Sequence, residues 1–88
     1  MARFKPVTTE IAAPTTSGTA VDVSSANVVR AVNTAAATAL VTLTEAGGAT
    51  VGTMTLVPNE TVFIDKGKTQ KVFASANTVR LTSVSYPM

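Results

Sequence analysis

Residues 39–56 read Ala-Leu-Val-Thr-Leu-Thr-Glu-Ala-Gly-Gly-Ala-Thr-Val-Gly-Thr-Met-Thr-Leu, and this stretch decides the fold class. Side chains at positions 39, 41 and 43 alternate with those at 40, 42 and 44, which is the period of a β-strand. We expect the first set to face the core. Gly47 and Gly48 favour a hairpin turn over residues 45–49, because glycine tolerates positive φ. Residues 50–56 are therefore expected to return antiparallel to residues 39–44.

The same alternation continues on both sides of this hairpin. Val29 and Ala31 oppose positions 28, 30 and 32, and Phe63 opposes Val62 and Ile64. Turns are expected at residues 57–60, where a Pro-Asn pair suits a type I or type II turn, and at residues 65–68 and 75–77. The pattern predicts an all-β, antiparallel β-sandwich of about seven or eight short strands, with jelly-roll or immunoglobulin-like connections. The further strands are expected at residues 7–12, 19–23, 27–33, 61–64, 71–74 and 78–86.

The composition argues against catalysis. The 88 residues include no Cys, His or Trp. The chain therefore lacks the usual thiol nucleophile, the usual base near neutral pH and the commonest zinc ligands. Its serines and threonines have no base to activate them. We expect a protein that is not an enzyme and binds no cofactor.

The small size favours assembly with other subunits. We expect one domain over residues 1–88, and a domain of this length buries only about 60–65% of its unfolded surface. Disulfides are impossible without Cys, so a partner subunit is the remaining way to add stability. Charged residues make up 14% of the chain, against roughly 25% in typical soluble domains. A weakly charged surface rich in Thr suits burial against neighbours, and we expect a homo-oligomer.

Membrane insertion is not expected. No apolar run approaches the roughly 20 residues needed to span a bilayer. The start of the chain is polar where a secretory leader would be apolar, which favours synthesis and retention in a cytosol.

Nucleic-acid binding has one candidate site. Lys66, Lys68 and Lys71 surround one predicted turn, with Phe63, Phe73 and Tyr86 on strands that could border it. Lysines with aromatic rings could bind a single strand, but such a turn is more often a solvated loop that protects a sheet edge. The net charge of +2 is too small to favour nucleic acid by itself. Alternation also predicts that at least one of the two phenylalanines lies in the core.

The five carboxylates are scattered, with no calcium-loop spacing, so no metal site is expected. Asn59-Glu60-Thr61 fits the glycosylation pattern, but without a secretory signal we interpret it as a turn.

Five segments carry a resemblance to a known class of protein. The chain resembles short virion structural proteins of tailed bacteriophages, particularly of cyanobacterial phages, which carry an arginine strand, a glycine hairpin, a lysine turn and a Val-Phe-Ala strand. The resemblance covers about residues 28–86. The segments are Val29-Arg30-Ala31-Val32-Asn33, Leu40-Val41-Thr42-Leu43-Thr44, Thr55-Leu56-Val57-Pro58-Asn59-Glu60, Ile64-Asp65-Lys66-Gly67-Lys68-Thr69 and Lys71-Val72-Phe73-Ala74.

This resemblance implies a β-sandwich present in many copies in a virion, made in the host cytoplasm and decorating or cementing the capsid. Its partners would be the major capsid protein or neighbouring virion proteins. Two alternatives stay open: a tail, neck or fibre component that binds the host surface, and a small protein that binds single-stranded nucleic acid. Residues 1–18, rich in Pro, Ser and Thr, are interpreted as an arm that orders only against the shell or a neighbouring subunit.

Arg30 and Arg80 are the residues we expect to make specific contacts with a partner. Both lie in the middle of predicted strands, and a guanidinium can bind a carboxylate through two parallel hydrogen bonds. The alternative is that they are surface residues paired within their own sheet. Lys66, Lys68 and Lys71 complete the set of candidate contact residues.

Overall fold

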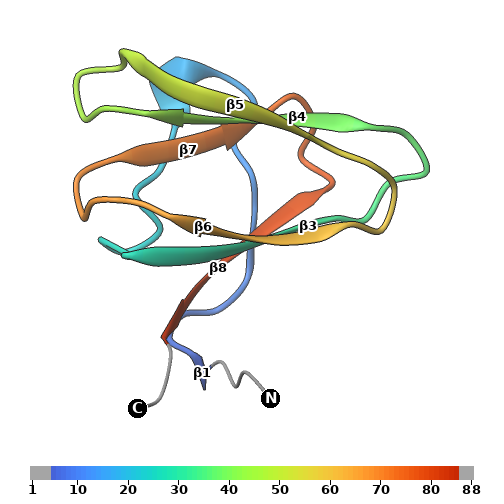
Figure 1. The fold of residues 1–88 in the computed structure, drawn as a ribbon, viewed down its shortest axis with the longest axis horizontal. Helices are drawn as coiled ribbons and strands as arrows, with labels where there is room; N and C mark the ends of the chain where they lie inside the picture. The colour runs from blue at the N-terminus through green and yellow to red at the C-terminus, as the bar shows by residue number, and fades with distance from the viewer. Residues whose placement is uncertain (1–4, 86–88) are drawn as a thin grey trace.

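The chain folds as a sandwich of two antiparallel sheets, which Figure 1 shows with β5, β4 and β7 above and β3, β6 and β8 below. The computed structural model describes residues 5–85. These residues form eight short strands and one 3-10 helix, which confirms the expected all-β fold. The elements are β1 (Lys5–Pro6), β2 (Ile11–Ala12), η1 (Ser17–Thr19), β3 (Val28–Asn33), β4 (Ala39–Thr44), β5 (Thr50–Leu56), β6 (Thr61–Asp65), β7 (Lys71–Ala74) and β8 (Val79–Ser85).

The strand order is that of a jelly roll. The larger sheet runs β1-β8-β3-β6, with β2 also paired to β8, and the smaller sheet runs β5-β4-β7. The pairs are nested along the chain: β1 and β2 with β8, then Val21 with Val72 of β7, then β3 with β6, then β4 with β5. Nested antiparallel pairs divided between two sheets form the rolled-up hairpin of a jelly roll. Of the two expected connection schemes, the chain therefore has the jelly roll, with the Val21 bridge in place of a fourth strand.

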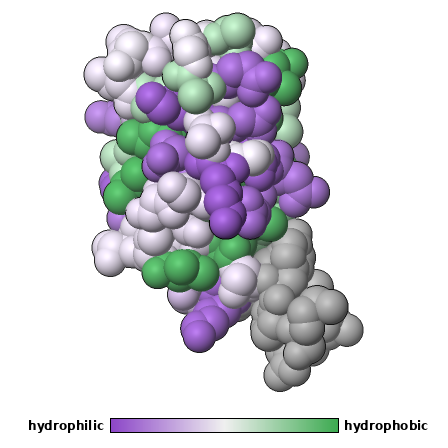
Figure 2. Space-filling view, turned by 90° about the vertical axis from the view of Figure 1, so that its left-hand side faces the viewer, coloured by the Kyte–Doolittle hydropathy of each residue, from purple (hydrophilic) through white to green (hydrophobic). Residues whose placement is uncertain are grey.

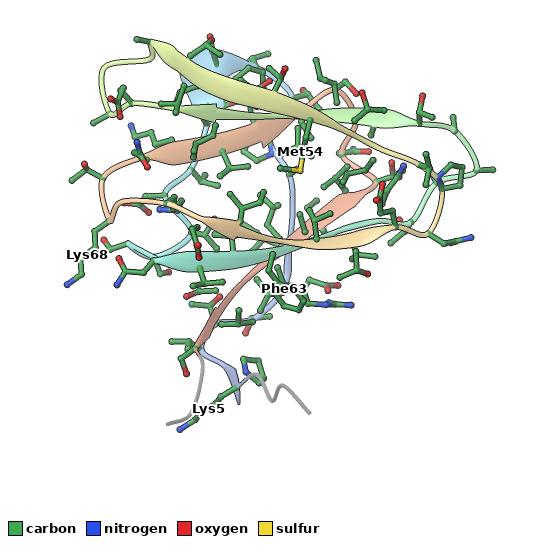
Figure 3. All side chains as sticks on the ribbon, in the orientation of Figure 1. Lys5, Met54, Phe63 and Lys68 are labelled. Carbon is green, nitrogen blue, oxygen red and sulfur yellow. The ribbon has the colours of Figure 1, made fainter. Side chains whose placement is uncertain are left out.

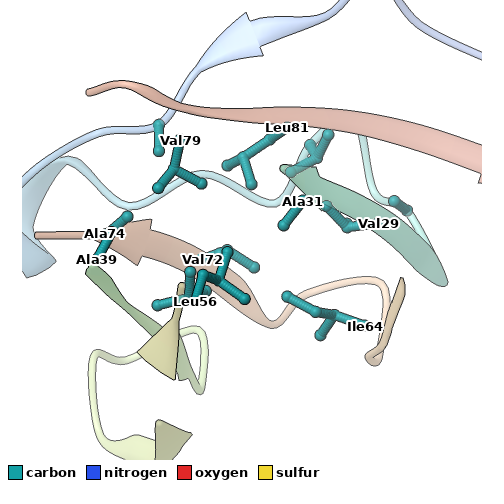
Figure 4. Packing of buried hydrophobic residues seen from close by; sticks show 13 residues of the cluster. Val29, Ala31, Ala39, Leu56, Ile64, Val72, Ala74, Val79 and Leu81 are labelled. Carbon is teal, nitrogen blue, oxygen red and sulfur yellow. The ribbon is translucent and has the colours of Figure 1, made fainter. Parts of the chain in front are cut away.

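The core between the sheets consists of small and medium aliphatic side chains (Figure 4). Ala39 and Val41 of β4 are buried, as expected for the inward face of that strand, and Val29 and Ala31 of β3 are buried as well. Leu43, from the same face of β4, is partly buried against this cluster. The residues with no measurable exposure include Val29, Ala31, Leu56, Val72, Ala74, Val79 and Leu81.

The expectation that a phenylalanine lies in the core is wrong for both candidates. Phe63 is 40% exposed on the outer face of β6, and Phe73 is half-buried on the outer face of β7. The inward positions of these strands belong to Ile64 and Val72. Alternation fixes which side chains share a face, but the sandwich places the aliphatic set inside and the rings outside.

Both predicted turns beside β5 are confirmed. Gly48 has a φ of 100° in the turn between β4 and β5. In the turn before β6, the Glu60 amide donates to the Val57 carbonyl oxygen at 3.1 Å, and Asn59 has a φ of 64°. Positive φ at the third position identifies this as a type II turn.

The N-terminal segment departs furthest from expectation. The predicted strand over residues 7–12 is replaced by two shorter strands, β1 and β2, and the predicted strand over residues 19–23 is reduced to the single bridge at Val21. From Lys5 onward, the segment that we interpreted as an arm pairs with β8 of its own chain, and Ala13 is 2% exposed in the core. This part of the segment is therefore docked on its own sandwich. Residues 1–4 of that predicted arm lie outside the described residues, as does Tyr86 at the end of the last predicted strand.

A left-handed turn precedes β3. Val23, Ser24 and Ser25 have φ values of 54°, 58° and 59°, and the Ala26 amide donates to the Asp22 carbonyl oxygen at 3.1 Å. Left-handed conformation costs residues other than glycine roughly 1–2 kcal/mol each. Val23 and Ala26 are each 4% exposed, so their burial in the core holds the strained turn in place.

Replacing the exposed Ser24 with glycine is expected to raise the free energy of unfolding by about 0.5–1 kcal/mol. Glycine removes the strain, although it also gains freedom in the unfolded chain. Urea denaturation of Ser24→Gly, compared with Ser17→Gly at an exposed position without positive φ, checks this. The control should be unchanged or less stable, and a loss of stability in Ser24→Gly would contradict the assignment of strain.

Candidate functional site

The outer face of the larger sheet carries the best candidate site, here called the Arg30 face. Val29 and Ala31 enter the core, so Arg30 between them points outward. The strand register places it opposite Phe63 of β6 on one side and Thr82 of β8 on the other. Figure 3 shows Phe63 on the side of β6 that faces away from the other sheet.

A shallow depression of about 480 Å³ lies on this face. Thr82 and Val84, which are 6% and 7% exposed, are the buried residues in its wall. The Arg30 guanidinium donates to Glu10 Oε2 at 3.4 Å, with 38% and 45% of the two side chains exposed. An ion pair this open contributes little to stability. The lining residues are Pro6, Thr8, Glu10, Arg30, Phe63, Thr82 and Val84.

The Arg30 face has the chemistry of a binding surface for a protein partner. Arginine and aromatic side chains are enriched at protein interfaces, where they provide bidentate hydrogen bonds and large contact areas. The weak pair with Glu10 could be exchanged for a carboxylate of a partner at small cost. The lining residues include no nucleophile paired with a base.

Arg80 lies on the same face as Arg30. It is exposed on β8, opposite Ala12 of β2 and Val32 of β3. Because Val32 is two residues along β3 from Arg30, the two arginines are diagonal neighbours across the β3–β8 pair. The structure thus brings together the two arginines selected from the sequence.

The three lysines do not form one patch. Lys66 is only 7% exposed, and its ammonium donates to the carbonyl oxygens of Gln70 at 2.8 Å and Gly67 at 3.1 Å. Lys68 is exposed in the turn, and Lys71 is half-buried on β7, in the other sheet from Arg30. The Lys66 side chain therefore stabilises the turn in which it lies. In Figure 2, which shows the end of the molecule with the 45–49 and 66–70 turns, hydrophilic residues occupy the middle among small groups of hydrophobic ones.

Burial lowers the pKa of Lys66 below the usual lysine range, an effect partly opposed by the negative charge of Asp22. The unfolded chain therefore binds more protons between this lowered pKa and the ordinary value of about 10.4, so the free energy of unfolding should rise with pH in that window. Below the window Lys66 is charged in both states and contributes no slope.

This pH dependence can be assigned to Lys66 by substitution. Lys66→Met should remove the part of the alkaline rise in stability that comes from this residue, whereas Lys68→Met at the exposed position should keep it. Urea denaturation at several pH values across the window measures how steeply the free energy of unfolding rises with pH in each variant. Equal slopes in the two variants would contradict the role of Lys66.

A second feature, missed in the sequence, lies at the open side of the sandwich between β5 and β6. An apolar slot of about 260 Å³ opens here. The residues that line it are Val41, Leu43, Gly52, Thr53, Met54, Phe63, Ile64 and Asp65. Figure 3 shows Met54 pointing from β5 into the space between the sheets, and 41% of this residue is exposed. The feature of the sequence that could have indicated this exposed apolar surface is the run of residues 46–59, which contains no charged residue.

Within residues 5–85, no three His, Cys, Asp or Glu side chains gather closely enough to hold a metal ion. Two of the carboxylates cap main-chain or amide groups: Glu60 accepts from the Val57 amide, and Glu45 from the Gln70 side chain. In the same range helical structure is confined to η1, which is far too short to cross a bilayer.

Comparison with known proteins adds no assignment to this geometry. The chain matches no model of a protein family, no curated protein and no solved structure.

Proposed function

We propose that this protein is a non-enzymatic structural component of a tailed-bacteriophage particle, attached in many copies to the capsid as a decorating or cementing protein. The observation that carries the proposal is the Arg30 face, a broad outer sheet surface with an exposed ring, two arginines and buried Thr and Val residues. The resemblance of residues 28–86 to virion structural proteins supplies the class of partner. Jelly rolls recur in viral capsid proteins, but also in lectins and cupins, so the fold alone decides nothing.

Attachment would combine burial of Phe63 with hydrogen bonds from Arg30 and Arg80 to carboxylates of the shell protein. Charged residues are few, so the contact would be largely apolar and would tolerate salt. A binder of single strands would lose affinity steeply as salt rises, because affinity would come from displaced counterions.

The decisive experiment is quantitative mass spectrometry of purified virions, with copies of this chain compared with copies of the major capsid protein. Copy numbers similar to those of the shell protein support decoration. A small fixed number would overturn it in favour of a neck, tail or fibre role. Complete absence would overturn the structural role.

The contribution of the Arg30 face is tested by rebinding purified protein to particles that lack it. Arg30→Gln combined with Arg80→Gln should weaken rebinding at least tenfold, and Phe63→Ala should do the same. Lys68→Gln, in the exposed turn, serves as the control and should bind as the original protein does. Unchanged rebinding by the arginine double variant would rule out this face as the contact.

A further inference from the structure

The two sheets have four edges, and three of them are protected. The edge formed by β1 and β2 is interrupted between Pro6 and Ile11. The edge at β7 is covered, because Val72 exchanges hydrogen bonds with Val21 in both directions and the Ala74 amide donates to the Pro14 carbonyl oxygen. At the third edge, β6 has only five residues, ends in the exposed Asp65 and follows Glu60. Short strands, charges and covering segments are the usual devices against edge-to-edge pairing.

The fourth edge, β5, has almost none of these devices. It is one of the two longest strands, with seven residues, of which the first six are exposed. It contains no charged residue and no proline. It pairs with β4 on one side and, within residues 5–85, with no strand on the other. A bulge near Val51 interrupts its register at one end, and the regular stretch runs from Gly52 to Leu56.

The hydrogen-bonding direction of β5 follows from its neighbours. The Leu40 amide and carbonyl oxygen both bond to Ser75, so the main chain of Leu40 is directed toward the β7 side of β4. Alternation then directs Val41 toward β5, where its register partner is Met54. The main-chain groups of Met54 therefore point to β4, and those of Thr53 and Thr55 point to the free edge.

The side chains of β5 complement those of a second β5 about a twofold axis through Thr53. An antiparallel pair centred there places Thr53 opposite its own copy and Met54 opposite Gly52 of the second chain. Nothing lies within 4 Å of a Cβ added at Gly52, so there is room for the methionine. Each half-exposed Met54 would then be covered at the mouth of the apolar slot, and no like charges would meet along the strand.

We propose that this protein forms a symmetric dimer through antiparallel pairing of β5 with β5 of a second copy, which joins the two smaller sheets into one of six strands. The paired strand lies in the smaller sheet and the Arg30 face on the larger one, with Phe63 lining both the slot and the depression, so a dimer on the shell could engage two attachment sites. Edge pairing of one strand buries less surface area than a standard protein interface. The dissociation constant of the dimer is therefore expected to be roughly 10–100 µM. Multiple copies on a particle would raise the effective concentration above this value.

Sedimentation equilibrium of the full chain tests the pairing. The apparent mass should rise from the 9.0 kDa of one chain toward twice that value as the concentration increases to about 1 mM. Thr53→Lys places like charges opposite each other at the twofold axis and should weaken association at least tenfold. Thr69→Lys, the same change in an exposed turn, should associate as the original chain does.

The register is tested by disulfide crosslinking. Because the chain contains no cysteine, an introduced cysteine can pair only with its copy in a second chain. Hydrogen-bonded antiparallel partners lie about 5.5 Å apart between Cα atoms, within reach of a disulfide. Thr53→Cys should therefore form a covalent dimer under oxidised glutathione much faster than Thr69→Cys. A monomer at all concentrations, association unaffected by Thr53→Lys, or equal crosslinking by both variants would overturn the dimer. None of these results depends on particles, so this proposal can fail while capsid attachment stands, and the reverse.

Discussion

Replacing Leu81 with alanine is expected to lower the free energy of unfolding by about 3–5 kcal/mol, the largest effect of a single substitution that we predict. Leu81 has no measurable exposure and lies between Ile11 and Ala31 in the register of the larger sheet. Its removal leaves a cavity that these neighbours, fixed in a sheet, fill only in part. A domain of this size has a total stability of about 4–13 kcal/mol, so the variant loses a large share of it.

Leu40→Ala is the matched control, since it makes the same chemical change at a residue that is 43% exposed. It should cost less than about 1 kcal/mol. Urea denaturation followed by circular dichroism gives both values. Similar losses in the two variants would mean that Leu81 does not occupy the buried position that the structure assigns to it.

Replacing Asn33 with leucine is expected to cost about 3 kcal/mol, although leucine has a similar size. Asn33 has no measurable exposure at the end of β3. Its side-chain amide donates to the carbonyl oxygens of Ala37 at 2.9 Å and Leu56 at 3.1 Å, and its Oδ1 accepts from the Ala35 amide at 3.1 Å. Leucine would remove the partner from these groups, of which the Leu56 carbonyl oxygen is buried and the other two are partly buried, and an unsatisfied buried group costs roughly 1–3 kcal/mol.

Asn77→Leu, in an exposed turn, controls for the general effect of placing leucine on the chain and should be close to neutral. Asn33→Asp gives a second comparison, because a carboxylate facing these carbonyl oxygens should also destabilise the fold while keeping the size of the side chain. If Asn33→Leu proved as stable as Asn77→Leu, the hydrogen bonds of Asn33 would not hold the ends of β3 and β5 together.

The strands near the hairpin were predictable because their pattern is local. Alternation identified the inward positions of β4 and the two sets of side chains that share a face in β3, and the Gly-Gly and Pro-Asn pairs indicated the turns. The two arginines were identified from their places in the middle of predicted strands. Each is flanked by buried residues and therefore faces outward: Val29 and Ala31 flank Arg30, and Val79 and Leu81 flank Arg80. In these cases the neighbouring residues alone decide the conformation.

The remaining features become visible only in the folded chain, and most of them depend on residues that are distant in sequence. No glycine marks the left-handed turn at Val23, which is imposed by burial of its side chain against the sandwich. Lys66 looked like a surface residue because its carbonyl partners become visible only when the turn is built. The exposure of β5 is likewise a property of strand order. Periodicity says which side chains share a face but does not say which strand is left at an edge.

The nested order of the strands also governs how the chain reaches its fold. In the larger sheet, β8 is the strand that joins β1 and β2 to β3, so the sheet stays divided until one end of the described chain meets the other. Ile11 and Leu81 are register partners, and such distant pairings give the domain a high contact order. Folding is therefore expected on the millisecond-to-second scale typical of β-sandwiches. During that interval the uncharged strand β5 is exposed, so dilute conditions should favour correct refolding over aggregation.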